Sequence, residues 1–440
     1  MNTLSLTVAP PDACSPEEPG RIRLAVGDIV LTRLLRQPGS RLDEALIAAP
    51  DALAFWLCDH WWRLRWETIP QGRQPADWRL AHELTSVGGG FAWPRISIWG
   101  DADRVGLLGR ADPVGVVGPV RYLTDALVYV EASGFEGEVD RFLDRVADEH
   151  SGFGSDRVAL RALITALRQE RCDPEVALWR RLEARLGYDP DAGPDEVVEA
   201  VGELAAECGL AGVEEAVAAT PGAEAPSLLV DAIARAKRTG HACDFSGVLA
   251  AVSPARPLGS DPPWMAAEAA AAGVRAAFGV APGPIKPTDL GEILGTSRYS
   301  FRNTPRRDER PYGLRVHASG SVARQRVSLR TRSPQARRFE LCRALGDALW
   351  SPSDTLGPLA DTATDRQKFQ RAFAQSLLCP YEDLRGFLAT DQPTEDDIEA
   401  AATHFHVNPS VITTLRWNKG QRVSDKTGGA DDVAERLEAA

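Results

Sequence analysis

The segment from Ser333 to Leu349, SPQARRFELCRALGDAL, is the stretch from which the fold of the C-terminal part of this chain can be predicted. We expect a helix from Gln335 to Trp350. The residues before it predict two strands, Gly313–His317 and Arg326–Arg330, which are joined through Ser319-Gly-Ser and form a hairpin. A hairpin that leads into a helix is therefore the predicted centre of this region.

Further helices are predicted after this one. One runs from Asp365 to Leu378 and stops at Cys379-Pro380, because proline cannot continue a helix. A final pair, Glu395–Phe405 and Pro409–Leu415, begins at the cap Thr394 and is broken at Val407-Asn-Pro. The C-terminal region is thus predicted to be mainly helical, with one hairpin.

This order of elements and several of its residues resemble the ImmA/IrrE family of metallo-endopeptidases. In that family a hairpin leads into an Arg-Phe-x-Leu-Ala-His-Glu-Leu-Gly-His helix, and Phe339, Leu341, Leu345 and Gly346 match it. The later Phe373-Ala-Gln-Ser-Leu-Leu-Cys-Pro resembles the segment that follows the third zinc ligand. The resemblance covers roughly residues 265–420, and it implies a zincin-like fold.

The zinc-binding residues of the family are replaced in this chain. An H-E-x-x-H helix binds zinc because residues four apart share one face, and its glutamate polarises the metal-bound water. In register, those positions hold Arg343, Ala344 and Asp347, and the position of the third ligand holds Gln367. The resemblance therefore implies a degenerate site without catalytic residues, and no cofactor is expected.

Two arrangements of Arg343 and Asp347 are open from the sequence. At i and i+4 the two side chains can form an ion pair that fills the space a metal would take. Alternatively, they are two solvated charges on an outer face of the helix.

Composition limits the class of protein. The chain has 440 residues and a net charge of −12, which argues against a whole-chain electrostatic footprint for nucleic acid. Its seven cysteines lie far apart without a C-x-x-C pair, so neither a disulfide framework nor a zinc ribbon is expected. No uncharged apolar run is long enough to span a bilayer, and we expect a cytoplasmic protein without membrane contact.

The whole chain is predicted to be a multidomain α+β protein. Seven of its eleven tryptophans lie between Trp56 and Trp99, and they form either an aromatic core or a surface that stacks on flat ligands. The predicted divisions are a flexible tail (1–20), a Trp-rich α+β domain (21–150), a helical region (155–252), a Pro-rich linker (253–263), the ImmA/IrrE-like domain (264–422) and a polar tail (423–440).

Other candidate site residues come from weaker patterns. His82-Glu83 imitates the start of a zincin helix but lacks the second histidine, and together with His317 it is an alternative source of metal ligands. The histidine is otherwise expected inside an aromatic core. A run of arginines from 298 to 338 could meet phosphates or an acidic partner, or form a solvated rim, and its binding candidates are Arg306, Arg307, Arg337 and Arg338.

These observations favour a pseudopeptidase that acts as a regulatory or partner-binding factor with protein partners. Active members of the resembled family cleave repressor-type transcription factors in bacterial stress, prophage and defence settings. One alternative is an active zinc metallo-endopeptidase with a nonstandard site. The other is a DNA-binding regulator that uses the arginine run and the closing helix pair, although nucleic acid is not the favoured partner.

Overall fold

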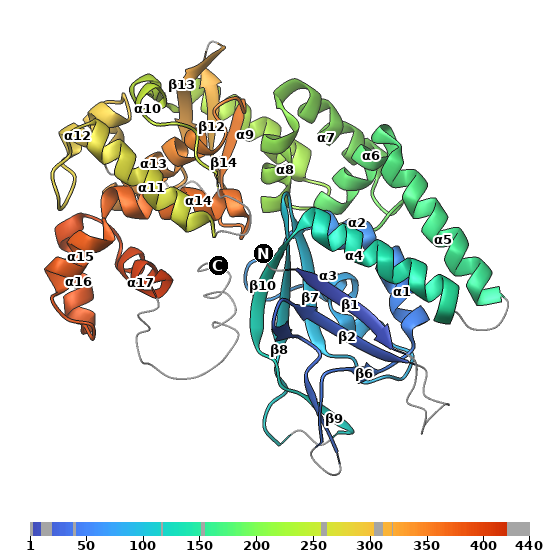
Figure 1. Ribbon diagram of the computed structural model, residues 1–440. Coiled ribbons are helices and arrows are strands. Elements are labelled where there is room, and N and C mark those ends of the chain that lie inside the picture. The colour runs from blue at the N-terminus through green and yellow to red at the C-terminus, as the bar shows by residue number, and fades with distance from the viewer. Residues whose placement is uncertain are drawn as a thin grey trace. The chain divides into compact units, whose positions relative to one another are not determined.

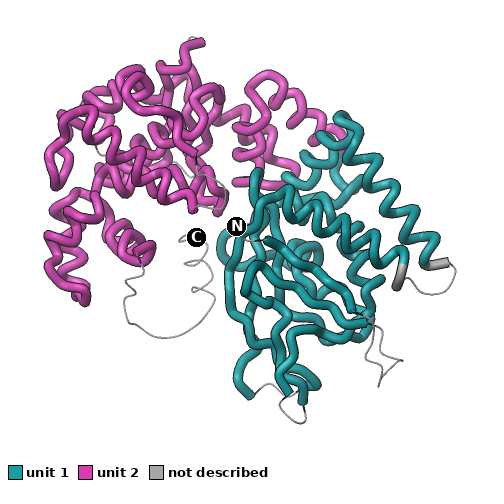
Figure 2. The backbone as a smooth tube through the Cα atoms, viewed as in Figure 1, with its two compact units in different colours: residues 1–194 teal, residues 195–440 magenta. Residues whose placement is uncertain are grey.

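A computed structural model of the chain describes residues 3–9, 20–37, 41–115, 118–150, 155–256, 262–302, 311–318 and 320–419. The chain divides into two compact units, unit 1 (residues 1–194) and unit 2 (residues 195–440), which Figure 2 shows in different colours. Both helices and strands occur in each unit, so the predicted mixture of helix and strand is confirmed.

Unit 1 combines three small antiparallel sheets with helices. The sheets have the strand orders β1-β2-β3 with β6 beside β2, β10-β8-β7, and β5-β4-β9. The elements are β1 (Leu4–Ala9), β2 (Arg21–Val26), β3 (Ile29–Val30), β4 (Leu34–Arg36), β5 (Arg41–Asp43), β6 (Leu46–Ile47), α1 (Pro50–Asp59), α2 (Trp61–Trp66), α3 (Ala76–His82), β7 (Arg95–Asp101), β8 (Arg104–Arg110), β9 (Val120–Tyr122), β10 (Ala126–Glu131), α4 (Ala132–Arg145), α5 (Ser155–Cys172) and α6 (Pro174–Arg185).

The expected flexible tail over residues 1–20 is wrong for Leu4–Ala9, which form strand β1. Leu4, Leu6 and Val8 are buried and alternate with less buried residues, as expected for a strand with one face on the core. The strand pairs antiparallel with β2 from Leu4↔Val26 to Ala9↔Arg21. Residues 10–19 and the predicted polar tail at 423–440 lie outside the described residues.

Most of the tryptophans in unit 1 belong to its core. Trp56, Trp61, Trp62, Trp78, Trp93 and Trp99 are all buried, which confirms the interpretation of the cluster as an aromatic core. Trp66 is only partly buried and packs against that core.

In its described residues, unit 2 contains one four-stranded antiparallel sheet with helices packed around it, as Figure 1 shows. The sheet has the order β11-β13-β12-β14. The elements are α7 (Asp195–Cys208), α8 (Leu210–Ala219), α9 (Ala225–Thr239), β11 (His241–Asp244), α10 (Ser246–Ala251), α11 (Pro263–Ala277), α12 (Pro287–Ile293), β12 (Gly313–Ala318), β13 (Ser321–Ser328), α13 (Pro334–Trp350), β14 (Leu356–Leu359), α14 (Asp365–Leu378), α15 (Tyr381–Leu388), α16 (Glu395–Phe405) and α17 (Pro409–Asn418).

The hairpin and the helices predicted in the C-terminal region are present, but the second strand runs from Ser321 to Ser328 and not from Arg326 to Arg330, and the last helix extends to Asn418. Strands β12 and β13 pair antiparallel from Leu314↔Ser328 to Ala318↔Ser321. Helices α13, α14 and α16 match their predicted bounds to within one residue at each end.

The boundary between the two units falls inside the stretch 155–252, which the sequence predicts as one helical region. Helices α5 and α6 belong to unit 1, whereas α7 to α10 belong to unit 2. Strand β11, from the same stretch, pairs with β13 through Cys243↔Gln325. Of the Pro-rich segment 253–263, residues 257–261 lie outside the described residues, and Pro263 is the first residue of α11.

Candidate functional site

Helices α13 and α14 place the candidate site of unit 2. Each begins with a side-chain cap, since Ser333 Oγ accepts a hydrogen bond from the amide of Ala336, and Thr364 Oγ1 accepts one from the amide of Gln367. The helices pack closely where Gly346 faces the ring of Phe373, and a Cβ at Gly346 would lie 2.9 Å from that ring. The backbones can approach because this position has no side chain.

The four positions of the degenerate motif lie together between these helices. Arg343, Ala344 and Asp347 come from α13 and Gln367 comes from α14, and none of them is more than 2% exposed. Arg343 Nη2 donates a hydrogen bond to Gln367 Oε1 at 2.7 Å and another to the carbonyl oxygen of Ala360. The two helices thus bring together the residues that the resemblance assigns to one site.

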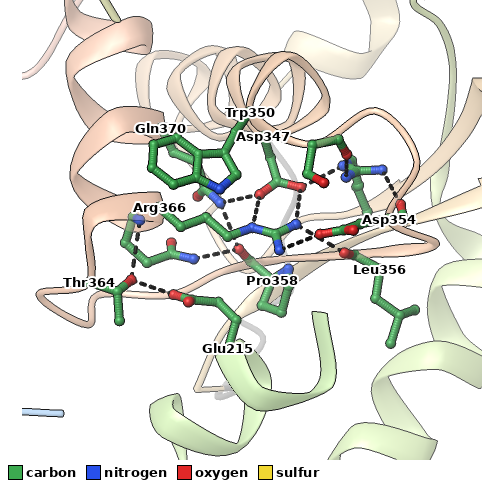
Figure 3. A network of polar contacts seen from close by, with 12 residues as sticks. Glu215, Asp347, Trp350, Asp354, Leu356, Pro358, Thr364, Arg366 and Gln370 are labelled. Atoms are coloured by element: carbon green, nitrogen blue, oxygen red, sulfur yellow. Dashed lines mark hydrogen bonds and ion pairs between the residues drawn. The ribbon is translucent and has the colours of Figure 1, made fainter. Parts of the chain in front are cut away.

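The carboxylate of Asp347 is the centre of a buried polar network, shown in Figure 3. Its Oδ1 accepts hydrogen bonds from Arg366 Nε and Gln370 Nε2, both at 2.6 Å. Its Oδ2 accepts from Arg315 Nε at 2.6 Å and from Arg366 Nη2 at 3.0 Å. A carboxylate offers about four acceptor positions, so all of them are used.

The two arginines of the network have further acceptors. Arg315 donates to the carbonyl oxygens of Asp354 at 3.1 Å and Ser351 at 3.2 Å. Arg366 Nη1 donates to the carboxylate of Asp354 at 2.8 Å, and its Nη2 donates to the carbonyl oxygen of Leu356 at 3.1 Å. Asp347 and Asp354 together balance the two guanidinium charges, as a buried charge cluster requires.

Two glutamines of α14 complete the polar contacts. Gln367 Oε1 also accepts from the amide of Ala360 at 3.0 Å, and its Nε2 donates to the carbonyl oxygen of Pro358 at 2.8 Å. Gln370 Nε2 donates to the same Pro358 oxygen at 3.0 Å. Both amides are therefore held by backbone groups of β14, and Gln367 also by Ala360 directly after it.

Glu215 of α8 connects the site to a helix far away in sequence. Its Oε1 accepts a hydrogen bond from Thr364 Oγ1 at 2.5 Å, and Thr364 is the cap of α14. Figure 3 shows Glu215 on the side of Arg366 away from Trp350. This contact fixes the start of α14 and hence the position of Gln367.

Burial and charge act in opposite directions on the ionisable groups. Burial alone would raise the pKa of Asp347, but Arg366 and Arg315 outweigh it and hold this pKa below its ordinary value. Burial, together with the nearby charge of Arg371, lowers the pKa of Arg343 to about 9. Asp347 is therefore a well-compensated anion, whereas Arg343 is a poorly compensated cation.

Neither arrangement expected for Arg343 and Asp347 is present. Both side chains are buried, so they are not solvated charges on an outer face. They also do not pair with each other, because Asp347 binds Arg315 and Arg366, while the ion pair of Arg343 is with Asp361 at 3.8 Å. The arginines that bind this carboxylate come instead from β12 and α14.

The residues at this site do not suit zinc. Protein ligands of zinc are thiolates, imidazoles and carboxylates. Arg343 provides only donors, Ala344 has no polar group, Gln367 is an amide with its atoms already hydrogen-bonded, and the oxygens of Asp347 are saturated. No general base stands at position 344. The hydrogen bonds of the site can keep α13, α14, β12 and the loop between α13 and β14 in fixed relative positions.

The weaker metal candidates lie in separate places. His82, in unit 1, is fully buried, with Nδ1 2.6 Å from the carbonyl oxygen of Ile98 and Nε2 2.9 Å from Glu67 Oε2, and its ring stacks on Trp78. His82 is thus a hydrogen-bonded histidine inside an aromatic core, which is one of the two arrangements expected for it. Glu83 is half-buried at the end of α3.

His317 is half-buried on β12 in unit 2. Burial and the charge of Arg315 lower its pKa. Within the parts of the chain that the structure describes, no group of three or more His, Cys, Asp or Glu side chains could hold a metal ion.

The described arginines of the run are divided between surface and interior: Arg315, Arg337 and Arg338 are buried, whereas the exposed ones are Arg298, Arg302, Arg324, Arg326 and Arg332. Arg337 is buried and donates to the carbonyl oxygens of Ser300 and Thr331, and its Nη2 lies 2.7 Å from His241 Nε2. Arg338 is buried as well and donates to the carbonyl oxygen of Ile285 at 3.0 Å. Arg306 and Arg307 lie outside the described residues.

Several residues of the site were not predicted as such. Arg366, Gln370 and Glu215 carry no motif, and Arg315 was assigned to a surface run although it is fully buried. The spacing of residues in α14 was an available signal. Arg366, Gln367 and Gln370 lie on one face of this helix, next to the apolar Phe369 and Phe373, and this pattern indicates polar groups inside a core.

None of the helices in the described parts of the chain is long and apolar enough to cross a membrane. Comparisons of the chain with protein-family models, with curated proteins and with solved structures found no match.

Proposed function

We propose that unit 2 contains a catalytically degenerate ImmA/IrrE-like domain, and that the protein is a regulatory, partner-binding pseudopeptidase. The observation that carries this proposal is the convergence of Arg343, Asp347 and Gln367 in one buried site where none of them is free to bind zinc. In a peptidase scaffold that has lost its metal, the residues at the ligand positions would bond to other protein groups, as these three residues do.

The chemistry of the site supports binding more than cleavage. Hydrolysis by a zinc peptidase needs a metal-bound water and a glutamate that polarises it. The glutamate position holds Ala344, and the guanidinium groups of Arg343 and Arg366 bind Gln367 and Asp347. A rigid network of this kind keeps α13 and α14 in place, and a partner surface built on them would persist without a metal.

The expected partner is a protein. Active members of the resembled family cleave repressor-type transcription factors, and a degenerate copy would bind such a factor and leave it intact. Under this proposal, the protein sequesters such a factor in the cytoplasm and thereby regulates bacterial stress, prophage or defence responses.

The test is affinity capture of the full-length tagged chain from its native cells, with the bound proteins identified and their lengths measured. We expect a transcription factor recovered at full length, unchanged by a zinc chelator. Recovery of cleaved fragments that disappear with the chelator would contradict the proposal and favour an active nonstandard peptidase. Capture that depends on nucleic acid and weakens steeply with salt would instead favour a DNA-binding regulator.

A further inference from the structure

A short 3-10 helix of unit 2, η3 (Arg298–Phe301), exposes an aromatic ring with two arginines beside it. The side chain of Tyr299 is 57% exposed. The guanidinium carbon of Arg302 lies 4.3 Å from the centre of the Tyr299 ring, and that of Arg298 lies 5.6 Å from it. An aromatic ring and a guanidinium plane are both flat surfaces on which a further ring can stack.

The residues on either side of Tyr299 are fixed by local and buried contacts. Ser297 caps η3, since its Oγ accepts a hydrogen bond from the amide of Tyr299. Ser300 is buried, and its Oγ lies 3.1 Å from Nδ1 of His241 on β11. Phe301 is buried as well. The exposed ring therefore belongs to a stretch that is held in place before a partner binds.

A third exposed arginine, Arg332, lies in the same part of the surface. Arg337 donates from Nε to the carbonyl oxygen of Ser300 at 3.0 Å and from Nη1 to that of Thr331 at 3.2 Å. One guanidinium group therefore holds η3 next to the segment before α13, in which Arg332 follows Thr331. The exposed residues that this contact brings together, which we call the Tyr299 patch, are Arg298, Tyr299, Arg302 and Arg332.

In the described parts of the chain, the three arginines of the Tyr299 patch have no carboxylate partner. Other arginines of the same run do have one. Arg324 lies 3.9 Å from the carboxylate of Asp244, and Arg330 binds Glu340 at 3.0 Å. The patch is thus a local concentration of uncompensated positive charge in a chain whose net charge is −12.

We infer that the Tyr299 patch binds single-stranded nucleic acid without reading its sequence. The arginines contact phosphates, and an unpaired base stacks on the Tyr299 ring or on a guanidinium group beside it. The exposed ring favours this partner over an acidic protein segment, because carboxylates pair with cations but do not stack. The inference does not depend on the proposed function, since the patch contains none of the motif positions and a protein partner can bind another surface.

Fluorescence anisotropy of a labelled strand of about 12 thymidines, titrated with the full-length protein, tests the inference. We expect a dissociation constant of roughly 10⁻⁴–10⁻⁶ M at physiological salt, as for other nonspecific complexes. Three phosphate contacts, at about 0.7 each, predict a slope of about −2 for the logarithm of the association constant against that of the salt concentration. Absence of binding in this range, or binding that salt does not weaken, would overturn the inference.

Two further probes separate stacking from charge. An abasic strand of the same length keeps the phosphates but has no bases, so it should bind about tenfold more weakly than the thymidine strand. A poly-glutamate peptide of similar charge should also bind more weakly than the thymidine strand. Equal binding of the abasic strand would show that no base stacks, and tighter binding of poly-glutamate would assign the patch to an acidic protein partner. Either result contradicts the inference.

Four variants locate the binding site. Tyr299→Ala should weaken binding of the thymidine strand about tenfold and leave binding of the abasic strand unchanged. Arg298→Gln, Arg302→Gln and Arg332→Gln should each reduce the steepness of the salt dependence by about 0.7. The control is Arg79→Gln, which removes an exposed arginine of α3 in unit 1 and should change neither quantity.

Thermal melting of each variant separates loss of binding from loss of fold. All four side chains of the patch are exposed, so the variants should melt at nearly the same temperature as the natural protein. A folded Tyr299→Ala variant that still binds the thymidine strand about tenfold more tightly than the abasic strand would place the stacking surface elsewhere and contradict the inference.

Discussion

Arg343 of α13 donates a 2.7 Å hydrogen bond to Gln367 of α14, and both side chains are almost completely buried. In the resembled peptidases these two positions hold zinc ligands. Here a donor and an acceptor bind each other directly, without a shared metal. This hydrogen bond connects the two helices directly at the positions that the resemblance assigns to metal ligands.

Removing the charge of Asp347 should destabilise the protein strongly. Asp347→Asn keeps the shape of the side chain but leaves Arg315 and Arg366 without their main counter-charge, and breaking a buried ion pair in this way costs about 3–5 kcal/mol. Urea unfolding followed by circular dichroism measures the loss. The control is Asp231→Asn, an exposed position of α9, which should change the unfolding free energy by less than about 0.5 kcal/mol. Equal effects of the two substitutions would show that the network does not stabilise the fold.

Removing the charge of Arg343, unlike that of Asp347, should not destabilise the protein. Its pKa is lowered to about 9 because the charged form is buried, so at neutral pH the guanidinium destabilises the folded state. Arg343→Met is expected to leave the melting temperature unchanged or raise it, whereas Arg315→Met should lower it because Asp347 loses a partner. Thermal melting of the two variants at pH 7 makes the comparison, and a larger loss for Arg343→Met would refute this account of the charges.

Gly357 of β14 has no room for a side chain. A Cβ there would lie 1.8 Å from Asp347 Oδ2 and 2.5 Å from Arg315 Nε. Gly357→Ala should therefore destabilise the protein by displacing the carboxylate, by about 1–3 kcal/mol as for other overpacked sites. Gly386→Ala in α15 is the matched control, because nothing lies within 4 Å of its Cβ and alanine favours a helix. Denaturant unfolding should give opposite signs for the two substitutions.

The stabilisation by Asp347 should depend on pH in the acid range. The folded pKa is below the ordinary value, so the contribution is fully present above the unfolded pKa of about 3.9 and is lost as the pH falls through the folded pKa. The difference in unfolding free energy between the natural protein and Asp347→Asn should be constant near neutral pH and shrink below about pH 4. A difference that grows on acidification would have the wrong sign for a stabilised carboxylate.

The sequence predicted local structure and the location of the site better than its contacts. The helices at 335–350 and 365–378 and the hairpin before them follow from hydrophobic spacing and from breakers such as Pro380. Helix and hairpin bounds depend on nearby residues, and a sequence records these directly. The four motif positions came instead from the resemblance to the ImmA/IrrE signature.

The partners of Asp347 were missed because they are distant in sequence. Arg315 lies 32 residues away on another element, and Arg366 lies 19 residues away. Arginines in a charged run are usually solvated, so only the fold reveals that Arg315 is buried. Strand β1 was missed because prolines at 10, 11, 16 and 19 and a Glu-Glu pair give residues 1–20 the composition of a flexible tail, although Leu4, Leu6 and Val8 alternate as in a strand.

The central proposal is that the site between α13 and α14 does not bind zinc, and elemental mass spectrometry of the purified protein after incubation with zinc tests it most directly. A second sample carries Arg343→His, Ala344→Glu, Asp347→His and Gln367→Glu, together with Arg315→Met and Arg366→Met, so that no buried arginine loses its counter-charge. We predict no stoichiometric zinc in the natural protein and about one equivalent in the folded variant. Stoichiometric zinc in the natural protein that is lost on Asp347→Asn would contradict the account.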